Sequence, residues 1–188
     1  FEKNSSITSV TVGHAVREIM PYAFSGCSGI TALTFAENSV LTAIPSHAFA
    51  YCSGIRSLML PKSITEIGEN AFVACGALEK VLLPENLGSI GSDAFLDCRS
   101  LYDVMNVSDL SIAQNSNNGY VGYYALAIRR SNVPLSVTTI AASNTSARFV
   151  KHNNVWYLVG LDVISNTREV EIPKLIINGV SYNYQIFS

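Results

Sequence analysis

The stretch Ile67-Gly68-Glu69-Asn70-Ala71-Phe72-Val73-Ala74-Cys75 decides the fold, because its Ala-Phe-x-x-Cys end occurs four times. The four copies are Ala23-Phe24…Cys27, Ala48-Phe49…Cys52, Ala71-Phe72…Cys75 and Ala94-Phe95…Cys98, with 25, 23 and 23 residues between successive cysteines. A unit of this length cannot bury its apolar face alone and must stack on its neighbours. The spacing therefore predicts a repeat solenoid.

Further apolar positions keep the same register. Each block is preceded by an isoleucine four residues before its alanine and followed by Ile or Leu three residues after its cysteine. Residues 33–35, 58–60 and 81–83 then alternate in the period-two pattern of short half-buried strands. A two-residue insertion near residues 36–40 accounts for the longer first spacing. We expect it to bulge from one edge without disturbing the ladder.

The remaining parts of each repeat predict tight local structure. The Ala-Phe-x-x-Cys-x-x-Ile/Leu piece has apolar residues at i, i+3 and i+6, which fits a short helical or 3₁₀ turn. Residues 16–19 and 64–67 place two polar residues between two apolar ones, which fits a bent second strand or a turn. Each repeat is thus expected to be one coil, with a strand on one side and a tight turn on the other.

The pattern from Ile67 to Cys75, followed by Leu78, Val81 and Pro84, resembles the treponemal-type leucine-rich repeats of BspA-like surface proteins over residues 7–105. Residues 119–125 are similar to an insert that separates repeat blocks in that family, and residues 170–184 resemble the start of another block. The resemblance implies an α/β leucine-rich-repeat solenoid with short strands on a concave face. It also implies a cell-surface or extracellular location and adhesion to matrix proteins, such as fibronectin and fibrinogen, or to other cells.

The chain divides by pattern into two parts. Residues 1–105 form the predicted stack of about four to five 23-residue coils, and residues 106–188 form a small α+β unit. In the second part, the apolar spacing at residues 120–130 predicts a helix, and residues 148–150 and 155–163 predict strands around Asn153-Asn154. Asn178-Gly179 predicts a hairpin between residues 175–177 and 180–186. We expect this unit to cap the open end of the stack and to lead toward a further repeat.

The four cysteines admit three interpretations: disulfides, a metal site, or small buried side chains. Equivalent side chains in stacked coils point the same way, which disfavours a disulfide. The three histidines, His14, His47 and His152, follow no ligand spacing. Buried free thiols are therefore the favoured interpretation, and no metal or other cofactor is predicted.

Composition and motifs argue against several classes of function. The formal net charge of −2 gives no basic surface for nucleic acid, and no apolar run approaches the length of a membrane helix. The sequence contains none of the phosphate-loop, zinc-protease or nucleophile-elbow motifs. We expect a non-enzymatic module whose partner is a protein, while the sequence indicates no oligomeric state.

Aligned strands define two outward columns as the candidate binding surface. One consists of Thr11, Thr34, Met59, Leu82 and Met105, and its neighbour consists of Ser9, Ala32, Ser57, Lys80 and Asp103. The expected contact residues are Met59, Leu82 and Met105, together with Thr11, Thr34, Lys80 and Asp103. The alternative is that the tail folds over Met59, Leu82 and Met105 and makes the column internal.

Two other functions stay open. The chain could be a structural spacer that projects another domain, or a glycan-binding module that uses Tyr120, Tyr123, Tyr124, Trp156 and Tyr157. We favour a core role for these aromatic residues. The triplets beginning at Asn4, Asn106 and Asn144 match the N-glycosylation pattern, which matters only where the source glycosylates asparagine.

Overall fold

The computed structural model describes residues 1–114, 118–130, 137–141, 145–152, 154–163, 175–177 and 180–186. The chain divides into two compact units, Phe1–Asn132 and Val133–Ser188. We describe each unit by itself.

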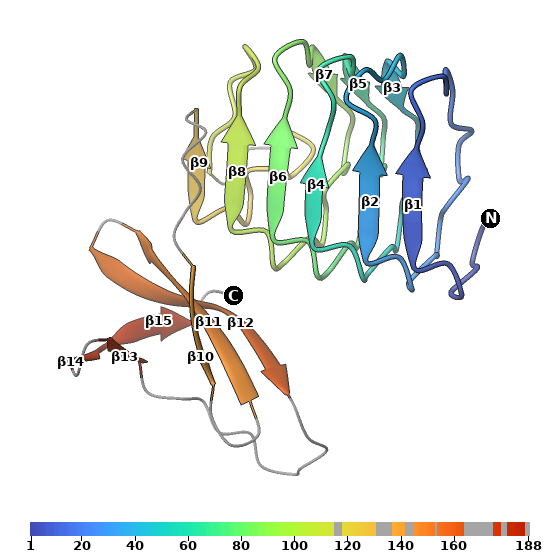
Figure 1. The fold of residues 1–188 in the computed structure, drawn as a ribbon. Helices are drawn as coiled ribbons and strands as arrows, with labels where there is room; N and C mark the ends of the chain where they lie inside the picture. The colour runs from blue at the N-terminus through green and yellow to red at the C-terminus, as the bar shows by residue number, and fades with distance from the viewer. Residues whose placement is uncertain are drawn as a thin grey trace. The chain divides into compact units, whose positions relative to one another are not determined.

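The first unit is a solenoid whose coils each contribute one strand to a parallel array (Figure 1). The array consists of β1 (Ser9–Val12), β2 (Ala32–Phe35), β4 (Ser57–Met59), β6 (Lys80–Leu83), β8 (Asp103–Asn106) and β9 (Ala127–Arg129). A second, narrow sheet consists of β3 (Ala43–Ile44), β5 (Glu66–Ile67) and β7 (Ser89–Ile90). Strands pair one repeat apart, as in Leu58↔Val81 and Val81↔Val104. The predicted leucine-rich-repeat stack is confirmed.

The Ala-Phe-x-x-Cys block forms consecutive turns, not a helix. The N–H groups of Val73 and Cys75 donate to the carbonyls of Asn70 and Phe72, three residues earlier, at 3.2 Å each. Asn70 and Ala74 have φ of 53° and 56°, and such left-handed residues prevent a helix from propagating. The same two positions are left-handed in all four copies of the block, and no helix is assigned in the described part of the chain. The expected tight turn is therefore present, with the i→i−3 hydrogen bonds of a 3₁₀ turn, but it does not extend into a helix.

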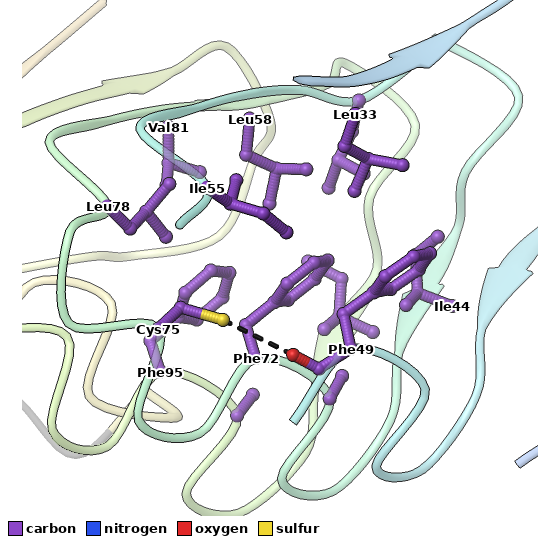
Figure 2. Close-up of a cluster of buried hydrophobic side chains, with 14 of the residues drawn as sticks. Leu33, Ile44, Phe49, Ile55, Leu58, Phe72, Cys75, Leu78, Val81 and Phe95 are labelled. Carbon is purple, nitrogen blue, oxygen red and sulfur yellow. Dashed lines mark hydrogen bonds between the residues drawn. The ribbon is translucent and has the colours of Figure 1, made fainter. Parts of the chain in front are cut away.

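Phenylalanine and cysteine form the spine of the stack (Figure 2). The rings of Phe1, Phe24, Phe49, Phe72 and Phe95 stack in that order, with centroids 5.3, 5.2, 5.6 and 5.3 Å apart. The Cys75 thiol donates to the Phe49 carbonyl at 3.3 Å, and the other three cysteines make the equivalent bond. The four cysteines are free and buried, which confirms the interpretation as small core residues. Burial raises the pKa of the Cys52 thiol to about 12.

The ladder is interrupted on the strand side where the repeat is longer. β2 pairs with β1 and β4 pairs with β6, but β2 and β4 belong to different sheets. On the turn side the same two coils stay joined, because Phe24 and Gly26 donate to Ala48 and Ala50 at 2.9 and 2.7 Å. A Cβ on Gly54 would lie 2.6 Å from the Ile30 carbonyl oxygen, so these coils also approach closely there. The expectation that the insertion leaves the ladder undisturbed holds for the turn side only.

The helix expected over residues 120–130 is also absent. The buried residues of this segment are Val121, Gly122, Ala125, Leu126 and Ala127, a spacing that does not follow one helix face. The segment ends in β9, which pairs in parallel with β8, and the Ala127 N–H donates to the Tyr102 carbonyl at 2.9 Å. The stack therefore continues beyond residue 105. The pairing of β9 with β8 outweighs the helical preference of the segment.

The second unit is a small β structure. Its sheet has the order β10 (Val137–Ala141), β11 (Thr145–His152), β12 (Val155–Val163) and β15 (Tyr184–Ile186), beside a separate pair of β13 (Leu175–Ile177) and β14 (Val180–Tyr182). The antiparallel pair β11–β12 confirms the first expected hairpin. In the second, residues 175–177 pair with 180–182 as expected, but residues 184–186 form β15, which pairs in parallel with β12. Asn153 and Asn178-Gly179, at their turns, lie outside the described residues. Ala147, Phe149, Leu158 and Leu175 form the core.

Candidate binding surface

The outward side chains of β1, β2, β4, β6 and β8 form one surface, which we call the strand face. The strand pairing aligns the members of each predicted column, with Thr11 beside Thr34, Met59 beside Leu82, and Leu82 beside Met105. Exposure falls along the columns: Thr34 and Met59 are exposed, Lys80, Leu82 and Met105 are half-buried, and Asp103 is buried. The N-terminal half of the strand face is therefore its accessible half.

A hollow of about 350 Å³ opens on the accessible half. Its lining comes from β2 and β4 on the two sides of the interrupted ladder, and includes Ala32, Thr34, Phe35, Arg56, Ser57 and Met59. Met59 is 57% exposed. The Thr11 and Thr34 hydroxyls are hydrogen-bonded to each other at 3.1 Å beside it. The hollow thus combines an exposed thioether with hydroxyl groups and one guanidinium.

Charged residues link neighbouring coils at the edge of the strand face. Arg56 Nη1 lies 2.9 Å from Glu79 Oε1, one repeat away. Lys80 follows Glu79 in the same coil, and its Nζ lies 5.9 Å from the centroid of the buried Tyr102 ring in the next coil. The ion pair joins neighbouring coils and leaves the Arg56 side chain half-exposed, at 53%, beside the hollow.

The C-terminal half of the strand face is closed by Arg129. This residue extends the column of Met105 by one strand. Its Nε and Nη2 donate to Asp103 Oδ1 and Oδ2 at 2.7 and 2.8 Å, and its Nη1 lies 3.7 Å from the Met105 sulfur. Because Asp103 is 1% exposed, it serves this ion pair and is not an accessible contact. Sequence reasoning missed Arg129, although Ala127-Ile128-Arg129 repeats the strand pattern of Asp103-Val104-Met105.

The repeat register identifies the family. Six copies of the BspA type leucine rich repeat region match residues 1–120. The chain belongs to this family. Of the solved structures, the leucine-rich repeat protein of T. pallidum is 34% identical, with a TM-score of 0.53 over 56% of this chain and 48% of that one. The chain thus spans about half the length of this treponemal relative.

Two further leucine-rich-repeat structures are more distant. One from Bacteroides ovatus is 27% identical, with a TM-score of 0.49 over 55% of this chain and 26% of that one. A leucine rich cell surface protein from Faecalibacterium prausnitzii is 20% identical, with a TM-score of 0.31 over 93% of this chain and 50% of that one. No curated protein matches the chain.

The other candidate features of this BspA-type chain fall in separate places. Tyr120, Tyr123 and Tyr124 cluster at the end of the stack, with centroids 5.2 and 4.9 Å apart. Trp156 lies in the second unit, 6.0 Å from the Tyr182 ring. The two aromatic groups therefore belong to different units.

The glycosylation triplets differ in access. Asn4 is exposed, and Asn144 lies outside the described residues. Asn106 is 3% exposed, and its amide oxygen accepts bonds from the N–H and hydroxyl of Ser108 at 3.1 and 2.6 Å. The folded BspA-type stack thus makes Asn106 inaccessible to a glycosyltransferase.

The residues that the structure describes hold no group of three or more His, Cys, Asp or Glu side chains that could bind a metal ion. They also contain no helix long and apolar enough to cross a membrane.

Proposed function

We propose that this BspA-type repeat stack is a non-enzymatic protein-binding module of a cell-surface protein, and that its strand face contacts the partner. The hollow between β2 and β4 is the observation that carries the proposal. Repeat solenoids use their extended sheet faces for partner contact. The family resemblance supports a surface location and names host matrix proteins as the partner class.

The chemistry of the accessible half suits a protein partner. An exposed methionine is polarisable and adaptable, and adaptable side chains are common on protein-binding surfaces. Met59 is surrounded by hydroxyls and by Arg56, so an apolar centre has a polar rim, as in protein–protein interfaces. The buried ion pair of Asp103 and Arg129 moves the expected contact region to Thr11, Thr34 and Met59. Lys80, Leu82 and Met105 support it from the half-buried end.

A single substitution tests this proposal without disturbing the core. Met59→Asp places a charge at the centre of the contact region, whereas Met20→Asp places the same charge at a methionine that is 62% exposed outside the strand array. Binding to immobilised fibronectin and fibrinogen is measured by surface plasmon resonance. We expect a loss of about 30-fold for Met59→Asp, typical of a central contact residue, and unchanged binding for Met20→Asp.

Two results would overturn the proposal. Equal binding by the two folded variants would remove the strand face from consideration. Absence of binding by the unmodified chain to both matrix proteins and to a wider panel of surface proteins would favour the structural spacer. Circular dichroism melting of both variants checks that each remains folded.

A further inference from the structure

A second exposed feature lies on the turn edge of the stack, away from the strand array. The backbone ladder there aligns Gly26, Tyr51, Ala74 and Asp97. The N–H groups of the first three donate to the next coil: Gly26 to Ala50 at 2.7 Å, Tyr51 to Val73 at 2.8 Å, and Ala74 to Leu96 at 2.8 Å. We call this column the edge column. Tyr51 is its aromatic member and is 58% exposed.

The backbone of Tyr51 is costly for an aromatic residue. Its φ is 59°, in the left-handed region, where a bulky side chain is strained by on the order of 1–2 kcal/mol. The equivalent residue one coil earlier is Gly26, which adopts the same region without strain. Ala74 and Asp97, the equivalent residues of the next two coils, are also left-handed, so the turn sets this backbone in every coil. The exposed ring, and not the φ, distinguishes Tyr51 from Gly26 and Ala74.

The surroundings of Tyr51 leave its ring accessible. Its neighbours in the edge column, Gly26 and Ala74, have the smallest side chains, and a Cβ added at Gly76 in the next coil meets open space. In contrast, Tyr22, which is also exposed and left-handed, is stacked on His47 at 4.5 Å. Among the described residues, Tyr51 has no ring partner.

Two coils further, the column ends in groups that bind hydroxyls. Arg99 donates from Nε and Nη2 to Asp97 Oδ1 at 3.1 and 2.9 Å, which leaves Oδ2 as an acceptor. Both side chains are exposed, at 74% and 45%. The Tyr124 phenol is hydrogen-bonded to the Asp97 backbone, so the tyrosine cluster adjoins this end. Two coil steps are about 10 Å, comparable to the length of a disaccharide.

We propose that Tyr51, Asp97 and Arg99 form a site for a neutral oligosaccharide, with a pyranose ring on the Tyr51 face and sugar hydroxyls on the Asp97–Arg99 pair. Aromatic faces bind the apolar side of a flat ligand, and a few fixed polar groups set its orientation. Because the guanidinium is paired with a carboxylate, the site has no free positive charge to attract an acidic sugar. This site and its ligand class are independent of the strand face.

The test uses matched tyrosines with the same backbone strain. The chain is applied to a printed array of neutral, sialylated and sulfated oligosaccharides, and the glycan with the strongest signal is titrated calorimetrically. We expect a neutral glycan to bind, and Tyr51→Gly to weaken its binding at least about tenfold. Tyr22→Gly removes an equally left-handed tyrosine in the preceding coil and should leave the affinity unchanged. Asp97→Ala should also weaken binding.

The thermal midpoint separates a binding role from a folding role. Tyr51→Gly relieves the strained φ, so its midpoint should stay level or rise while its affinity falls. An array without a neutral binder, an equal affinity for Tyr51→Gly and the unmodified chain, or an equal loss for the two glycine variants would each overturn the proposal.

Discussion

The turn side and the strand side of the same coils respond differently to two extra residues. On the turn side, the Phe24–Phe49 stack and the Cys52 thiol bond to Phe24 are the same as in the other coils. On the strand side, the sheet stops between β2 and β4. The Ala-Phe-x-x-Cys spine therefore holds the register, whereas the strand face is free to vary in sequence and geometry.

The greatest loss of stability is expected when the Phe spine is broken. Phe72 is fully buried and stacks on Phe49 and Phe95. Phe72→Ala removes both contacts and leaves a cavity, so the free energy of unfolding should fall by about 3–5 kcal/mol. Urea unfolding monitored by circular dichroism measures this. Met59→Ala, on the exposed strand face, should change stability by less than about 0.5 kcal/mol. Similar losses for the two variants would contradict the division between spine and face.

The next effect concerns the closed end of the strand face. Arg129→Met leaves the buried Asp103 carboxylate without its ion-pair partner, so stability at pH 7 should fall by about 3 kcal/mol or more. Adding Asp103→Leu should recover most of the loss, since two apolar side chains then replace the pair. Chemical denaturation of the single and double variants measures both changes. A double variant as unstable as the single one would show that the pair is not the cause.

A smaller gain is expected at a strained turn position. Ala74 has φ of 56°, so Ala74→Gly should raise the free energy of unfolding by up to about 1 kcal/mol. Ala71, three residues earlier, has no positive φ and is buried. Ala71→Gly should therefore be destabilising. Opposite shifts of the thermal midpoint in the two variants would support the left-handed turn geometry, and shifts of the same sign would contradict it.

The sequence predicted the structure well where the residue pattern repeats, and less well where it does not. The period located the strands, the buried cysteines and both outward columns, because each position is fixed by burial in several coils. It failed at residues 120–130, where the apolar spacing suggested a helix but pairing with β8 determined the structure. It also placed Asp103 on an exposed column, since its partner Arg129 comes 26 residues later, outside the Ala-Phe-x-x-Cys blocks.

Amide hydrogen exchange measures the turn side and the strand side of the same coils at single residues, so it can show whether the spine is continuous where the sheet is interrupted. The Phe24 and Gly26 amides donate to the coil on the other side of the insertion and should exchange as slowly as those of Phe49 and Tyr51. The amides of Ser57 and Met59 lie on the edge of β4 toward β2 and should exchange faster than those of Lys80 and Leu82, which occupy the paired positions one repeat later. Equal protection of these two strand pairs, or rapid exchange at Phe24 and Gly26, would contradict a continuous spine beside an interrupted sheet.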